Sequence, residues 1–257
     1  QQMGLDVEPL SKEQVQQLEP HIDLDILGAV HYRCDAHLYP NKLIPQLVGY
    51  LKNAGVVFKT GSGVEKLVTS GTKITKVVTG DAEYDADQVI LAGGSWLPRL
   101  TKMAGVKLSL MPGKGYSFTI DNPAKKLNIP AILCEARVAI TPMDNRMRYG
   151  GTMEIAPIND NINMKRVEGI VRSVPSYFKN IDLPMPEKKD IWYGFRPCTP
   201  DGLPYLGASG KISNMIIAGG HAMSGLSLGP ASGKIVADIA MNRKPDMDIH
   251  AFRPDRF

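Results

Sequence analysis

The stretch NMIIAGGHAMSGLSLGPASGKIVADIAMN, residues 214–242, decides which fold the chain adopts. Its apolar start predicts a strand over 214–218, and its periodic apolar positions predict a helix over 229–242. Backbone N–H groups at the start of a helix lack intrahelical partners and carry partial positive charge. A strand, a glycine-rich loop and a helix in this order predict an α/β unit whose backbone approaches a ligand, although such a loop alone is a weak signal.

A second stretch of this kind, ADQVILAGGSWLPRL, lies at residues 86–100. Its apolar run from Gln88 to Ala92 predicts a strand covered on both faces, which runs directly into Gly93 and Gly94. Ligands bind at the carboxyl ends of strands in open α/β sheets, and glycines let the backbone approach a pyrophosphate or a ring. On spacing alone, a plain strand-to-helix turn explains the same residues equally well.

The third stretch is IWYGFRPCTPDGLPYLG, residues 191–207, in which Arg196 ends an aromatic strand. An arginine in such a setting is costly to bury without an anionic partner. Its planar guanidinium pairs bidentately with a carboxylate. The residues alone leave two interpretations open, a carboxylate ligand and a structural salt bridge to Asp201 or another acid.

The rest of the chain alternates helices with short strands. Helical periods predict helices over residues 10–20, 41–53 and 163–177, the second of them closed by Gly55, and residues 20–37 are turn-rich. Short alternating runs predict strands at VVFK (56–59), VEKLVTS (64–70), KITKVVTG (73–80), AEYDADQVILAGG (82–94), YSFTI (116–120), RVAITPM (137–143) and MRYGGTMEI (147–155). This order predicts a fold of α/β and α+β class with two interleaved lobes, one with parallel strands and one with a larger, mostly antiparallel sheet.

Composition argues against several classes of protein. The 257 residues are 43% hydrophobic and 22% charged, which is typical of a globular protein. The net charge of +4 is not gathered into a basic stripe, so nucleic acid is not expected as a partner. No apolar run approaches the roughly 18 residues of a membrane span. We expect a cytoplasmic protein without a transmembrane segment.

The cysteines point to neither disulfides nor a metal. Cys34, Cys134 and Cys198 are odd in number and far apart, without the spacing of a metal site. We expect them to be reduced thiols, mostly buried, and we expect no metal.

The three stretches, in this order and at these distances, resemble the D-amino-acid oxidase superfamily of FAD-dependent enzymes, and most closely its D-amino-acid dehydrogenases. The stretches DAHLYPNKLIPQLVGYLKNAGVVF (35–58) and PDMDIHAFRPDRF (245–257) carry the resemblance further. It implies a partial FAD-binding, Rossmann-like lobe and a mostly antiparallel substrate-binding lobe. The FAD-binding lobe would comprise residues 36–104 and 208–257, and the substrate-binding lobe residues 1–35 and 105–207.

The resemblance also implies site residues. Arg196 would bind the substrate carboxylate, with Tyr116, Met223 and His221 as further substrate contacts. Packing in a strand explains Tyr116 about as well, Met223 is also a common gap filler, and His221 fits an orienting role. The residues implied for FAD binding are Val64, Ala92, Gly93, Gly94, Trp96, Gly220, Gly225, Leu226, Ser227 and Leu228. No catalytic side chain is implied.

One departure from the family is large. A strand followed by GxGxxG and a helix is absent, since the strings at Gly61 and Gly113 lack both the third glycine and the helix. In the family this unit lies N-terminal to everything seen here. We therefore expect the chain to be the C-terminal portion of a longer enzyme. On its own, this fragment is expected to be inactive, with absent or weak FAD binding.

The reaction implied for the intact enzyme is oxidation of a D-amino acid, or a related amine, to the imino acid by hydride transfer to FAD. The imino acid then hydrolyses to a 2-oxo acid. Oxygen or a membrane quinone would accept the electrons, the latter with the enzyme peripheral at the inner face of the membrane. Two alternatives stay open: a glycine, sarcosine or 2-hydroxy acid oxidoreductase of the same superfamily, and a non-catalytic subunit that needs a partner chain for FAD.

Overall fold

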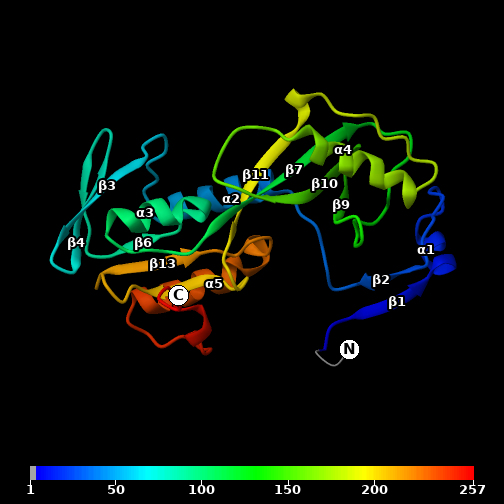
Figure 1. Cartoon of the computed structure of the whole chain (residues 1–257). Helices are drawn as coiled ribbons and strands as arrows, with labels where there is room; N and C mark the ends of the chain where they lie inside the picture. The colour runs from blue at the N-terminus through cyan, green and yellow to red at the C-terminus, as the bar shows by residue number, and fades with distance from the viewer. Residues whose placement is uncertain (1–3) are drawn as a thin grey trace. The chain divides into compact units, whose positions relative to one another are not determined.

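The computed structural model describes residues 4–257 and divides into two compact units (Figure 1). Unit 1 comprises residues up to 57, 115–153 and 160–194, and unit 2 comprises residues 58–114, 154–159 and 195–257. The mixed α/β and antiparallel class expected from the sequence is confirmed.

Unit 1 is built on a five-stranded sheet in the order β11-β7-β10-β9-β8. Its strands are β7 (Met111–Asp121), β8 (Ala131–Leu133), β9 (Val138–Met143), β10 (Arg146–Ile155) and β11 (Trp192–Cys198). Strands β9 and β10 form an antiparallel hairpin whose turn residue Asp144 has a φ of 54°. The first residues of β7 and the last residues of β10 and β11 belong to unit 2.

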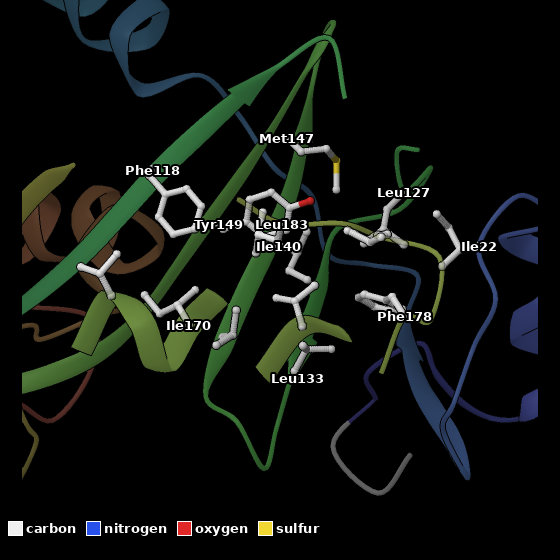
Figure 2. Close-up of a cluster of buried hydrophobic side chains, with 14 of the residues drawn as sticks. Ile22, Phe118, Leu127, Leu133, Ile140, Met147, Tyr149, Ile170, Phe178 and Leu183 are labelled. Carbon is white, nitrogen blue, oxygen red and sulfur yellow. The ribbon is translucent and has the colours of Figure 1, made fainter. Parts of the chain in front are cut away.

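One face of this sheet is apolar because side chains alternate along each strand. Val138 and Ile140 of β9 and Met147 and Tyr149 of β10 are buried, together with Ile170 of helix α4 (Met164–Ser173). Figure 2 shows this core, in which the rings of Phe118 and Tyr149 stack with centroids 5.6 Å apart. Burial raises the pKa of the Tyr149 hydroxyl to about 12, so it stays neutral.

Helix α4 is shorter than the predicted span of 163–177. It ends at Ser173, and a single 3-10 turn, Val174–Ser176, follows it. Pro175 explains the change, because proline has no N–H for an α-helical hydrogen bond.

The N-terminal part of unit 1 holds two helices and a two-stranded sheet. Helix α1 (Lys12–Leu18) starts with a capping box between Ser11 and Gln14, and α2 (Pro40–Asn53) is followed by Gly55 at a φ of 90°. Both helices were predicted. Strands β1 (Val7–Ser11) and β2 (Gly28–Tyr32) were not predicted; none of their residues is buried, so they leave no apolar alternation in the sequence. Helix α2 groups with unit 1, whereas the resemblance placed it in the FAD-binding lobe.

Unit 2 contains a three-stranded sheet in the order β12-β13-β6. Figure 1 shows β6 and β13 side by side. Strand β13 (Met215–Gly219) pairs in parallel with β6 (Val89–Leu91) and antiparallel with β12 (Tyr205–Ala208). The side chains of successive residues of β13 lie on opposite faces of this sheet. Ile217 packs beside Leu97 of helix α3 (Leu97–Met103), while Ile216 packs against helix α5 (Gly225–Ala240).

A meander of β3 (Val64–Ser70), β4 (Lys73–Thr79) and β5 (Glu83–Asp85) completes unit 2 and confirms the predicted strands. The buried Asn214 side chain ties it to β13: the amide nitrogen donates to the Ile74 carbonyl, and the amide oxygen accepts from the Ile74 N–H, both at 2.8 Å. The strand predicted at 56–59 is wrong. Those residues form no strand in the structure, and Val57 is 77% exposed.

Three further expectations need correction. Helix α5 begins at Gly225, not near Gly229, because Gly229 and Pro230 are accommodated inside the helix. Cys34 and Cys134 are exposed, so the thiols are not mostly buried. Strand β6 is not covered on both faces, since Ile90 is 45% exposed. No helix within residues 4–257 has the length and apolarity needed to cross a membrane.

Candidate functional site

Arg196 lies on β11, within the part of this strand that belongs to unit 2. Its guanidinium is half-buried, and this burial lowers its pKa by disfavouring the charged form. Burial also raises the pKa of the nearby Cys198 thiol, which donates to the Arg196 carbonyl at 3.4 Å. Asp201, the structural partner considered for Arg196, pairs bidentately with Arg256 instead, at 2.8 and 2.9 Å.

The glycine-rich loop between β13 and α5 lies directly against this part of β11. The Ala222 N–H donates to the Pro197 carbonyl at 3.0 Å, and Cys198 and His221 form an isolated antiparallel bridge. Gly220 has a φ of 84°, and a Cβ there would come within 2.7 Å of the Thr199 side chain, so only glycine fits. The structure therefore joins two of the three predicted segments by backbone hydrogen bonds.

The side chains of this loop and of the first turn of α5 differ in their contacts and exposure. His221 Nε2 is 2.8 Å from the Ser232 hydroxyl on α5, and burial lowers the histidine pKa, so the ring is neutral near pH 7. This contact fits an orienting role. Met223 is 74% exposed, and Leu226 and Leu228, in the first turn of α5, are also exposed. Gly225 and Ser227 belong to the same turn.

A hollow of about 740 Å³ in unit 2 contains part of the predicted cofactor-binding set. Its lining residues come from the loop before β3 and its first two residues, the turn between β4 and β5, and the turn into and start of α3. They are Gly61, Ser62, Gly63, Val64, Glu65, Gly80, Asp81, Trp96, Arg99 and Leu100. Val64 and Trp96 are therefore brought together. Ala92 lines a neighbouring hollow of about 330 Å³ with an apolar wall, and Gly94 has a φ of 55° with open space before it.

The chemistry of the larger hollow suits the adenine end of a dinucleotide. Its volume falls in the roughly 300–1,000 Å³ range of small-molecule sites. Trp96, 48% exposed, offers an aromatic face, and the exposed Arg99 offers a cation for a phosphate. Asp81 accepts from the Ser62 hydroxyl and, at 2.9 Å, from the Thr79 hydroxyl, and these bonds lower its pKa. Trp96 and Arg99 are therefore the lining residues whose chemistry fits the adenine end of FAD.

Sequence reasoning missed several of these lining residues, above all Arg99, Glu65 and Asp81. A signal existed for Arg99, because it follows Trp96 by three positions and such residues share a helix face. No signal existed for Glu65 and Asp81, which only the pairing of β3 with β4 brings to one hollow.

Tyr116 belongs to unit 1 and is 1% exposed. Its hydroxyl accepts from the Asn163 N–H at 3.3 Å and donates to the Asn161 carbonyl at 3.5 Å. This burial favours packing, the alternative weighed for it, over a place on a substrate wall.

Solved structures with the same fold include a glycine oxidase and an L-proline dehydrogenase. Glycine oxidase from Geobacillus kaustophilus superimposes on 100% of the chain with a TM-score of 0.89 at 24% identity, and the match covers 68% of that protein. L-proline dehydrogenase from P. horikoshii matches 100% of the chain with a TM-score of 0.88 at 20% identity, over 70% of its own length. At these identities, the likeness establishes the fold.

Sequence comparison establishes the family. The DAO family model, described as FAD dependent oxidoreductase, matches residues 1–239, and the chain belongs to this family. D-amino acid dehydrogenase from Allorhizobium ampelinum is 37% identical over 209 residues, 80% of this chain and 49% of that protein. The enzyme of the same name from Bradyrhizobium diazoefficiens is 33% identical over 226 residues, 87% of this chain and 52% of that protein. The chain thus spans about half the length of these curated relatives.

Proposed function

We propose that the chain is part of a flavoenzyme that oxidises a D-amino acid, or a related amine, at its CH–NH2 carbon, with Arg196 holding the substrate carboxylate. One observation carries the proposal. The glycine-rich loop expected beside the flavin is hydrogen-bonded to the strand residues that immediately follow Arg196. This contact would set a carboxylate clamp at a fixed distance from the flavin-binding backbone.

The residues of the chain act by binding and orientation. When bound, FAD supplies the acceptor for the hydride that leaves the substrate Cα. Arg196 fixes the carboxylate bidentately, which limits the orientations of the Cα–H bond. His221 orients the loop through Ser232 and is not required as a base if the amine enters neutral. Water then hydrolyses the imino acid to a 2-oxo acid and ammonia.

The proposal extends to the division of labour within the chain. Unit 2 would supply the FAD contacts through the hollow and the glycine-rich loop, and the antiparallel sheet of unit 1 would contribute to the substrate side. Oxygen or a membrane quinone would reoxidise the flavin, with peripheral attachment at the inner membrane face in the second case. A panel of dissolved oxygen and quinone analogues as acceptors separates the two.

Two alternative functions can also be tested. The likeness to glycine oxidase favours a small amine such as glycine or sarcosine, and a panel of D-amino acids, N-methyl amines and 2-hydroxy acids would separate these substrates. The second alternative is a non-catalytic subunit that needs a partner chain for FAD. Co-purification of a second polypeptide would support that reading.

The proposed function is tested by a visible absorption spectrum of the purified chain, recorded before and after excess FAD and desalting. Retained flavin absorption that bleaches on anaerobic addition of D-amino acids is the expected result for a competent protein. If the protein retains flavin but none of the amines or hydroxy acids bleaches it, the result counts against the proposed reaction. If the chain retains no flavin, the same bleaching test decides the matter on the chain extended to the length of its relatives.

The hollow leads to a prediction about Arg99. Arg99→Gln should weaken ADP binding about fivefold to tenfold while leaving adenosine within twofold, because only ADP carries phosphate charge. Quenching of Trp96 fluorescence measures both affinities, in a Trp192→Phe background that removes the other tryptophan. Lys102→Gln is the matched control, since Lys102 lies on the same helix but does not line the hollow. Equal losses of affinity for ADP and adenosine would show that Arg99 does not bind the phosphates.

A further inference from the structure

Phe195 connects the two functional segments of unit 2. It immediately precedes Arg196, and its carbonyl accepts from the Ser95 hydroxyl at 3.1 Å. Its ring meets the Trp96 ring edge to face, with centroids 6.1 Å apart and planes at 86°. Ser95 is 5% exposed, whereas Trp96 is 48% exposed and lines the hollow. One residue therefore contacts both the turn after β6 and the carboxylate-binding arginine.

A third contact limits how Phe195 can move. The ammonium of Lys114 lies 5.6 Å from the centroid of the Phe195 ring, and Lys114 is only 1% exposed. This ammonium is held in turn by the carbonyl of Asn159 at 2.7 Å and by its amide oxygen at 3.0 Å. A ring in contact with a held cation and with an indole can pass a displacement from one to the other, because close-packed interiors compress little.

We infer that Phe195 is a positioning residue that couples nucleotide binding in the hollow to carboxylate binding at Arg196, an inference that rests on the proposed function. A nucleotide that covers the exposed face of Trp96 restrains the indole. The edge contact and the Ser95 hydrogen bond then restrain Phe195, and with it the backbone of Arg196. Coupling between binding sites is reciprocal, so each ligand raises the affinity for the other by the same factor.

The test uses ADP and benzoate as probes, because neither reacts. The chain has two tryptophans, so Trp192→Phe leaves Trp96 as the only fluorescent indole. We expect saturating ADP to lower the benzoate Kd about fivefold, and saturating benzoate to lower the ADP Kd equally. In Phe195→Leu both factors should fall below about 1.5, a change that a purely structural role would not produce.

Two further variants sharpen the result. Phe118→Leu makes the same substitution in the core of unit 1, where Phe118 is 2% exposed, and should keep the full coupling factor. Ser95→Ala removes only the hydrogen bond to Phe195 and should reduce the factor to about twofold, which keeps the inference testable if Phe195→Leu does not fold. Unchanged coupling in the folded variants would overturn it.

Failure of the inference is distinguishable from failure of the proposed function. Benzoate binding that is equally tight with and without ADP overturns the coupling and leaves Arg196 as the carboxylate clamp. Absence of any benzoate binding, with ADP still bound, overturns both.

Discussion

Replacing Arg196 with methionine is expected to lower kcat/KM for a D-amino acid by a factor of about 10² to 10³, or roughly 3–4 kcal/mol of transition-state stabilisation. The half-buried guanidinium is the only group assigned to the substrate carboxylate, and methionine keeps most of its volume but none of its charge. Both kcat and kcat/KM should fall and KM should rise, because the proposed clamp would both bind the substrate and orient its Cα–H bond. Steady-state kinetics of the FAD-loaded protein with a dye acceptor measure both constants.

Graded variants separate charge from geometry. Arg196→Lys retains the positive charge but loses the planar fork, so it should recover only part of the activity. Arg172→Met is the matched control, since Arg172 lies on α4 with its side chain 78% exposed, and it should leave kcat/KM unchanged. A loss smaller than threefold in Arg196→Met would remove this residue from the site and leave the carboxylate without an assigned partner.

The sequence predicted those elements whose local pattern carries a signal. The meander from Val64 to Asp85 consists of short runs rich in β-branched residues separated by glycine turns, and Ser11 and Gln14 form the capping box that starts α1. The glycine-rich loop was found because Gly220 needs a backbone conformation that other residues rarely adopt. In each case the residues that determine the local structure lie within a few positions of the element that they form.

What the sequence could not predict depends on contacts between distant residues. Ser95 and Phe195 are 100 positions apart, and only the folded unit brings the hydroxyl to the carbonyl. Glu65 and Asp81 reach one hollow only through the register in which Val64 pairs with Thr79. Ile90 shows the same limit: its apolar neighbours suggest burial, yet whether both faces of β6 are covered is decided by the packing around it.

The C-terminal residues should contribute strongly to stability through Arg256. Arg256→Ala is expected to lower the free energy of unfolding by about 3 kcal/mol, or the melting temperature by about 6–12 °C. The Arg256 side chain is 10% exposed, donates to both oxygens of Asp201 and to the Leu203, Pro204 and Arg253 carbonyls, and lies 4.1 Å from the ring centroid of Tyr205. Urea unfolding followed by far-UV circular dichroism measures the loss.

The matched control is Arg253→Ala. The Arg253 side chain is 47% exposed and pairs with Asp255, which is itself 61% exposed, so its removal should cost less than about 0.5 kcal/mol. Its carbonyl, which accepts from Arg256, is unaffected by the substitution. Equal losses in the two variants would mean that the buried bonds of Arg256 add nothing beyond a surface ion pair.

The ion pair also predicts how this contribution depends on pH. Hydrogen bonds from Arg256 lower the pKa of Asp201 from 3.8 to about 2, so the folded state favours the ionised carboxylate. A depressed acid stabilises the fold above its unfolded pKa and loses that contribution as pH falls through the folded value. The gap between wild type and Arg256→Ala should therefore be constant above about pH 5 and narrow from pH 4 towards pH 2. It should not vanish, because the carbonyl bonds and the Tyr205 contact do not titrate, and Asp201→Asn should remove the pH-dependent part alone.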